Sequence, residues 1–235
     1  MADEAQLLQH CAPVFFLPNE SAWPGSIENN GTLGLIDTGL RKILVTCCHV
    51  WDGFVDFRSA THSARLATVF SNGFHPPVFL DAEPVSLSRD LDLAVFEARP
   101  ENWDMGYKRF HRPDRWPIPR ALAGQPVAFV GFAGEGRQCQ GFMGEFQYSF
   151  FGLSISAASD RKLMLAQDRS RVLRDNHGNL IPPMRMGGMS GSPAYLRSRT
   201  GAFSLAGFVQ MGSSSEDDIF LTHASFVKPD GTINL

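Results

Sequence analysis

The sequence predicts an all-β protein made of two six-stranded antiparallel β-barrels. Glycine and proline account for 22 and 15 of the 235 residues, and so many helix breakers suit short strands joined by turns. Short β-like segments bounded by Gly, Pro, Asn, Asp or Ser recur along the whole chain, as they do in sandwiches and barrels. With 43 % hydrophobic and 19 % charged residues, the chain has ample apolar material for a core.

The strand-like segments fall into two sets of six. Those in the first half are residues 14–17, 33–36, 43–48, 64–70, 78–80 and 93–97. Those in the second half are residues 127–132, 145–156, 163–167, 194–196, 203–210 and 219–224. Residues 99–126 are rich in Pro, Arg and Trp and separate the two sets. We therefore predict a first barrel over residues 1–112 and a second over residues 113–235, with a helical pattern only in the first ten residues.

The charge balance and the cysteines limit the classes of partner and compartment. A net charge of −3, from 21 basic and 24 acidic side chains, argues against a nucleic-acid binder. The N-terminus is acidic where a secretory signal is basic, and the longest apolar runs are too short to span a bilayer. Cys11, Cys47, Cys48 and Cys139 lack the spacing of a disulfide framework. We expect a cytoplasmic protein that binds neither nucleic acid nor a membrane.

The most informative stretch for chemistry is Gly-Gly-Met-Ser-Gly-Ser-Pro at residues 187–193. Glycines on both sides of Ser190 permit backbone torsions closed to other residues and leave the hydroxyl uncrowded. They also let successive backbone N–H groups point into one concavity, as an oxyanion requires. An isolated Gly/Ser loop has the same composition, however, and a hydroxyl is a poor nucleophile without a base. The interpretation therefore depends on whether a base and its orienting acid are present.

A candidate base and a candidate acid both precede Ser190 in the chain. His49 follows the apolar segment 43–48, which we interpret as a strand that ends at the histidine. Asp92 adjoins the hydrophobic segment 93–97, where a carboxylate needs a partner. Taken singly, His49 is typical of a histidine at the end of a strand, and Asp92 is typical of a residue that caps the start of a strand. Together with Ser190 they follow the order His, Asp, Ser, which is one of the known chain orders of the same triad geometry and the one found on double β-barrels.

At this point the chain resembles the chymotrypsin-like (trypsin-fold) serine peptidases, from about residue 14 to about residue 226. The anchors are TCCH at 46–49, similar to the family's T-A-x-H, DLAV at 92–95, GMSGSP at 188–193, and 205–212 as the strand after the nucleophile. The resemblance implies that Ser190 attacks the scissile carbonyl, that His49 moves the proton, and that Asp92 orients the imidazole. It further implies an oxyanion hole formed by the N–H groups of Gly188 and Ser190, and a site in the crevice between the barrels. No cofactor and no metal is expected.

The departures from the family's pattern concern regulation. Met189 stands where secreted trypsins carry the Asp that pairs with a new N-terminus, and the family's Ile-Val-Gly-Gly start is missing. The chain is therefore more similar to bacterial and viral relatives that need no N-terminal activation. It also ends at Leu235 without the family's closing helix, which leaves a regulatory protein or a fused domain open as a partner beside the polypeptide substrate.

The resemblance places five residues around the primary specificity pocket, namely Met184, Gln210, Met211, Gly212 and His223. Met184 occupies the position where trypsins hold an acid for Arg or Lys, so we expect an apolar or small side chain before the cleaved bond. His223 leaves two alternatives open. It could read an acidic substrate residue, as in some glutamyl-specific relatives, or it could be a strand histidine that faces solvent.

We predict a serine endopeptidase that forms an acyl-enzyme. An α/β-hydrolase is excluded because Ser192 breaks its Gly-x-Ser-x-Gly pattern, and because the acids and the histidine that follow Ser190 are packed too closely for that fold. Zinc binding through Cys47, Cys48 and His49 is also set aside, because no second ligand pair is present and consecutive strand residues face alternate sides. The alternative that stays open is a latent or catalytically silent trypsin-fold protein, acting as a partner-regulated binding module. In the latent form, a partner or ligand would order residues 176–189.

Overall fold

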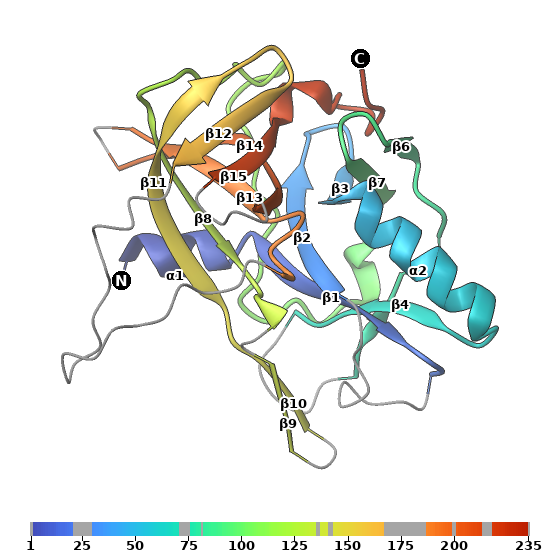
Figure 1. Cartoon of the computed structure of the whole chain (residues 1–235). Coiled ribbons are helices and arrows are strands. Elements are labelled where there is room, and N and C mark those ends of the chain that lie inside the picture. Colours follow the sequence, from blue (N-terminus) through green and yellow to red (C-terminus); the bar gives the residue numbers. More distant parts are fainter. Residues whose placement is uncertain are drawn as a thin grey trace, which may run out of the picture.

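The fold is all-β, and it consists of an open sheet and a closed barrel packed against each other (Figure 1). The computed structural model describes residues 2–20, 30–70, 76–80, 82–134, 137–140, 143–166, 187–198, 201–212 and 218–234. All strands of the open sheet precede residue 98, and all strands of the barrel follow residue 125. A division at residue 112 stays a prediction. No helix among the described residues has both the length and the apolar character needed to cross a membrane.

The first sheet has seven antiparallel strands in the order β5-β4-β1-β2-β3-β7-β6. Their bounds are β1 (Cys11–Leu17), β2 (Asn30–Asp37), β3 (Lys42–Thr46), β4 (Arg65–Thr68), β5 (Val78–Phe79), β6 (Ser86–Ser88) and β7 (Leu93–Glu97). The first unit therefore has seven strands where six were predicted, and its sheet is open where a closed barrel was predicted. The missed strand β6 is only three residues long and polar at two of them, so it has no hydrophobic alternation to indicate it.

One helix was missed altogether, and it changes where the candidate histidine stands. The strand expected over residues 43–48 ends at Thr46, and α2 (Cys48–Ala60) begins two residues later. Trp51 and Phe54 of this helix are buried and pack against aromatic rings of the first sheet. The ring centroids of Trp51 and Phe96, for example, are 5.5 Å apart. Valine and aromatic residues are common in strands, which hid the helical spacing of this buried face. His49 consequently lies in the first turn of a helix.

The second unit is the closed six-stranded barrel that the sequence predicts, with the order β11-β12-β15-β14-β13-β8. Its strands are β8 (Pro126–Gly131), β11 (Ser149–Ala158), β12 (Lys162–Ala166), β13 (Pro193–Arg197), β14 (Phe203–Gly212) and β15 (Asp218–His223). The single strand expected over residues 145–156 is divided. Its first part is β10 (Met143–Phe146), which forms a separate hairpin with β9 (Arg137–Gln140).

A shared hydrophobic core joins the two units. The expected N-terminal helix is α1 (Ala2–Leu8), and its Leu7 and Leu8 are buried in the same cluster as residues of both the sheet and the barrel. Short 3-10 turns, η2 (Pro100–Asn102) and η4 (Ala224–Phe226), follow β7 and β15. The connection between the units pairs with the first sheet through His111, whose carbonyl accepts from the N–H of Asp37 at 2.8 Å. The interface is therefore a packed core, which holds the two units in a defined relation.

Candidate active site

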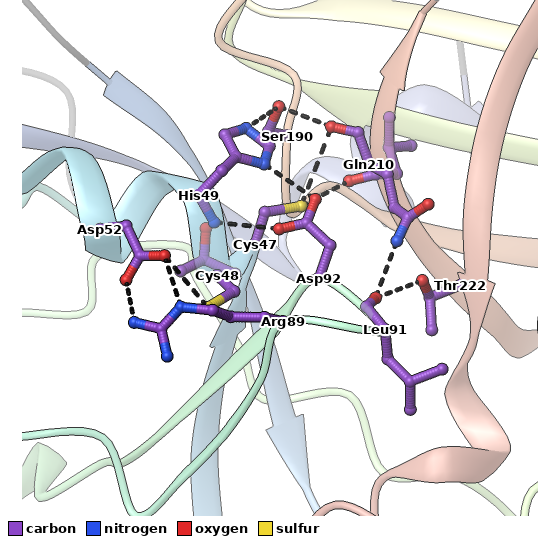
Figure 2. Close-up of polar contacts among 12 residues, drawn as sticks. Cys47, Cys48, His49, Asp52, Arg89, Leu91, Asp92, Ser190, Gln210 and Thr222 are labelled. Carbon is purple, nitrogen blue, oxygen red and sulfur yellow. Dashed lines mark hydrogen bonds and ion pairs between the residues drawn. The ribbon is translucent and has the colours of Figure 1, made fainter. Parts of the chain in front are cut away.

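The structure brings His49, Asp92 and Ser190 together from three separate elements (Figure 2). His49 lies in the first turn of α2, Asp92 ends the turn before β7, and Ser190 lies in the turn before β13. His49 Nδ1 is 2.8 Å from Asp92 Oδ2, and His49 Nε2 is 3.0 Å from Ser190 Oγ. A carboxylate only accepts hydrogen bonds, so Nδ1 carries the imidazole proton and the lone pair of Nε2 faces the hydroxyl. This is the arrangement in which a histidine acts as a general base toward a serine.

The Asp92 carboxylate is oriented from two directions. Its Oδ1 accepts the backbone N–H of His49 at 2.9 Å, while Oδ2 accepts from the imidazole. Asp92 has a φ of 52°, a left-handed conformation that is uncommon outside glycine and enriched in Asp and Asn. Residues held in such conformations concentrate at functional sites, where surrounding contacts maintain them.

Two hydrogen bonds from the barrel hold the residue before Asp92. The carbonyl of Leu91 accepts from Gln210 Nε2 and from Thr222 Oγ1, each at 2.7 Å. Gln210 was expected in the specificity pocket, but its side chain is buried and its amide holds Leu91 (Figure 2). Thr222 was not predicted, because nothing local in the sequence links it to Leu91. These two strand residues of the barrel therefore position the acid that the first unit supplies.

Thr32 of the first sheet holds the loop segment that carries Ser190. Thr32 of β2 donates its N–H to the carbonyl of Ser190 at 2.8 Å and its hydroxyl to the carbonyl of Gly188 at 2.9 Å. The same hydroxyl accepts the N–H of Phe132, at the end of β8, at 3.1 Å. Gly191 has a φ of 92°, and a Cβ there would collide with the carbonyl oxygen of Thr32. Only glycine fits at that position, because both the backbone conformation and the close approach exclude a side chain.

The two N–H groups expected in the oxyanion hole, those of Gly188 and Ser190, have no acceptor within the described residues. The carbonyl of Gly187 accepts the N–H of Gly134 at 2.6 Å. Because the C=O and N–H of a trans peptide point in opposite directions, the N–H of Gly188 is turned away from Gly134. Within the described residues, the N–H groups of Gly188 and Ser190 donate to no acceptor. Both groups are therefore available to a ligand oxygen.

The Ser190 hydroxyl has two acceptors within reach. Besides His49 Nε2, the carbonyl oxygen of Gln210 lies 2.7 Å from Ser190 Oγ. A serine hydroxyl has a single proton, so it donates to one of these acceptors at a time. Attack on a substrate requires the proton to face His49.

The other residues expected in the specificity pocket are only partly described. Met184 lies outside the described residues, and Met211 and Gly212 are described only by their backbone pairing with β15. His223 is 1 % exposed, its Nε2 donates to the carbonyl of Ser159 at 2.9 Å, and burial lowers its pKa. The reading of His223 as a solvent-facing strand histidine was therefore wrong. The alternative, that His223 reads an acidic substrate residue, stays a prediction.

The two adjacent cysteines are thiols and not candidate nucleophiles. Cys47 is fully buried, and its thiol donates to the carbonyl of Val209 at 3.1 Å. Burial raises the pKa of the Cys47 thiol well above its usual value, and the charge of Asp92 adds to the shift. The Cys48 thiol faces Asp52, and burial raises its pKa to about 11. The thiolate is the reactive form of cysteine, so Ser190 is the nucleophile that this arrangement supports.

Comparison with known proteins supports the fold independently of sequence. No family model and no curated protein sequence matches the chain. Among solved structures, the chain is similar to AL20, a thermostable serine protease from an extremophilic microorganism, with a TM-score of 0.53 over 93 % of this chain and 92 % of that chain. The two sequences are 12 % identical, so the likeness concerns the fold. The open sheet and the closed barrel together match the double-barrel fold of a serine protease.

Proposed function

We propose that the chain is a serine endopeptidase that hydrolyses peptide bonds through an acyl-enzyme. The observation that carries the proposal is the continuous hydrogen-bonded row from Asp92 through His49 to Ser190, with distances of 2.8 and 3.0 Å. In this row the base is within reach of the nucleophile, and the acid determines the tautomer of the base.

The first half of the reaction makes the acyl-enzyme. Ser190 Oγ attacks the scissile carbonyl carbon while its proton moves to His49 Nε2. The carbonyl oxygen becomes an oxyanion, which the N–H groups of Gly188 and Ser190 stabilise. Asp92 stabilises the imidazolium, which then gives its proton to the leaving amine as the C–N bond breaks.

The second half repeats the chemistry with water. His49 takes a proton from a water molecule that attacks the ester carbonyl, and it returns that proton to Ser190 Oγ as the peptide acid leaves. No cofactor enters either half.

Two features favour an enzyme that needs no N-terminal activation. Met189, at the position where secreted trypsins carry an acid, is completely buried in the hydrophobic core of the barrel. Uncharged hydrogen-bond donors of Thr32 and Gly134 hold the turn around Ser190. The latent alternative assigns its trigger to residues 176–189, of which residues 176–186 lie outside the described part, so it stays a prediction.

The compartment and the substrate belong to the same proposal. Cys11, Cys47 and Cys48 are free and buried, which suits a reducing, cytoplasmic environment. The preference for an apolar or small residue before the cleaved bond rests on Met184 alone and is best measured on a mixture of peptides of varied sequence.

The direct test is intact-mass analysis after treatment with a fluorophosphonate, which forms a covalent adduct with an activated serine. We expect one adduct on the parent chain and none on Ser190→Ala. A matched control is Ser192→Ala, since Ser192 lies two residues away and its hydroxyl has no partner within the described residues. Failure of the parent to form an adduct would contradict the proposal and favour the silent binding module.

A further inference from the structure

Three atoms of the kinds that bind metals converge beside the proposed active site. Cys47 Sγ, a ring nitrogen of His49 and a carboxylate oxygen of Asp92 all lie within 4.8 Å of one another (Figure 2). In a continuous strand, Cys47, Cys48 and His49 would face alternate sides and no second ligand pair would be present, which is why zinc was not expected. In the structure the strand ends at Thr46 and the chain turns into α2. The thiol of Cys48 faces Asp52, and the third ligand is Asp92.

We propose that Cys47, His49 and Asp92 form an inhibitory zinc site. Thiolate sulfur, imidazole nitrogen and carboxylate oxygen are the three ligand types of zinc in proteins, and three protein ligands leave the fourth position to water. A thiolate and an imidazole select zinc over calcium and magnesium, which prefer oxygen ligands alone. Around a tetrahedral zinc ion the ligand atoms are about 3.5 Å apart, so the observed cluster needs side-chain adjustments of roughly an ångström.

Charge and access both favour the cation. The Cys47 thiolate and the Asp92 carboxylate together carry two negative charges, which balance Zn²⁺ in a site that is partly removed from water. Cys47 is buried, but the side chains of His49 and Asp92 are 48 % and 21 % exposed. A cation therefore reaches the cluster from the solvent side and meets the sulfur beneath.

The proton balance explains why such binding inhibits. Zinc takes the place of the thiol proton, which is released to solvent, and bonds to His49 Nδ1. The imidazole stays neutral, so its proton moves from Nδ1 to Nε2. Nε2–H cannot accept the proton of Ser190, and Asp92 is engaged by the metal. Zinc thus holds the base in the wrong tautomer while Ser190 itself stays untouched.

Inhibition by zinc rests on the proposed function, whereas zinc binding does not. Binding and inhibition are therefore measured by two separate readouts. The first readout is the absorption spectrum of the chain with Co²⁺ in place of zinc. A bond between Co²⁺ and a thiolate gives a charge-transfer absorption band in the near ultraviolet. After chelator treatment, we expect this band on titrating the parent chain, the Ser190→Ala variant and the Cys48→Ala variant. Cys47→Ala should lack it. A parent chain without the band at saturating Co²⁺ overturns the proposal, whether or not the chain cleaves peptides.

The second readout is the zinc concentration that halves peptidase activity. We expect Cys47→Ala to require at least about tenfold more zinc than the parent, since loss of one ligand weakens a three-ligand site by that much or more, while Cys48→Ala behaves as the parent. Equal zinc sensitivity of parent and Cys47→Ala overturns the proposal. Cys47→Ser is a second variant in case the cavity left by alanine harms folding, because its hydroxyl keeps a donor toward Val209 but is a poor zinc ligand.

Discussion

The open sheet and the closed barrel contribute to the candidate site in different ways. The sheet unit supplies His49 and Asp92 from a helix and a turn, and their side chains are 48 % and 21 % exposed. The barrel supplies Ser190 from a glycine-bounded turn in which Met189 and Ser192 are completely buried. The proposed proton-transfer groups are thus open to solvent, whereas the proposed nucleophile is held in a packed turn.

Each unit also holds the functional residue of the other. Thr32 of the sheet bonds the backbone on both sides of Met189, and Gln210 and Thr222 of the barrel bond the residue before Asp92. The lesson of the comparison is that neither unit has a positioned site by itself. Variants that remove one side of this exchange test it.

Replacing the acid should have the largest effect. In Asp92→Asn, the amide favours the wrong tautomer of His49, and we expect kcat/KM to fall by about 10⁴. The matched control is Asp52→Asn on α2, whose carboxylate pairs with Arg89. If Asp92→Asn kept more than about a tenth of the parental kcat/KM, Asp92 would not be the acid of the site.

Removing the Thr32 hydroxyl should have the next largest effect. Thr32→Val keeps the shape of the side chain and the backbone hydrogen bond to Ser190, but it loses the hydrogen bond to the carbonyl of Gly188. This lost bond orients the adjoining N–H groups that are proposed to form the oxyanion hole. We expect kcat to fall by about 10- to 100-fold with little change in KM, since the lost alignment acts on the transition state.

The conservative variant Thr32→Ser distinguishes positioning from packing. It retains the hydroxyl and loses a methyl group, so it should restore most of kcat. A Thr32→Ser enzyme as slow as Thr32→Val would show that the methyl group, and not the hydrogen bond, supports the turn.

The two bonds to the Leu91 carbonyl should have smaller and partly redundant effects. Gln210→Met and Thr222→Val each leave one donor on this oxygen, so we expect each to lower the free energy of unfolding by about 1 kcal/mol and kcat by a few-fold. The double variant leaves the carbonyl without a donor from either side chain and should lose more than the sum of the single variants. Urea unfolding and steady-state kinetics on all three chains measure this, and strict additivity would contradict a shared role.

The smallest effect concerns the connection between the units, where burial lowers the pKa of His111 to about 4. As pH falls from 7 toward 4, the unfolded chain protonates His111 first, so stability is lost over that range. Between pH 7 and 5.5 the loss is about 1 kcal/mol for this residue. Thermal unfolding of the parent and of His111→Phe at both pH values should show a smaller pH dependence in the variant. His10 packs on the same ring and also has a lowered pKa, so part of the dependence should persist.

Much of the fold could be predicted from the sequence, and the errors of that prediction have local causes. The strands of the barrel were found because turn residues bound them. The helix α2 was missed because its buried face carries Trp51, Phe54 and Val50, residue types that also favour strands. The short strand β6 was missed because a strand of Ser-Leu-Ser has no hydrophobic alternation.

The sequence by itself determined which residue types are available for the chemistry. His49, Asp92 and Ser190 follow a known order, and the glycines beside Ser190 are a local signal for a sharp turn. These three residues were therefore predicted as a triad without the structure, and the structure brings them together. The assignment of Gln210 and His223 to the specificity pocket stays a prediction. The sequence did not reveal that both side chains are buried, because strand position alone does not tell which side of a barrel wall a side chain faces.

Only the tertiary structure decided which residues hold the site in place. The bonds from Thr32 to Gly188, from Gln210 to Leu91 and from Thr222 to Leu91 join residues separated by 156, 119 and 131 positions. The meeting of Cys47 with Asp92 likewise depends on where β3 ends and how the two units dock. Local composition carries no signal for such contacts, because their geometry is set by packing across the interface rather than by the torsions of neighbouring residues.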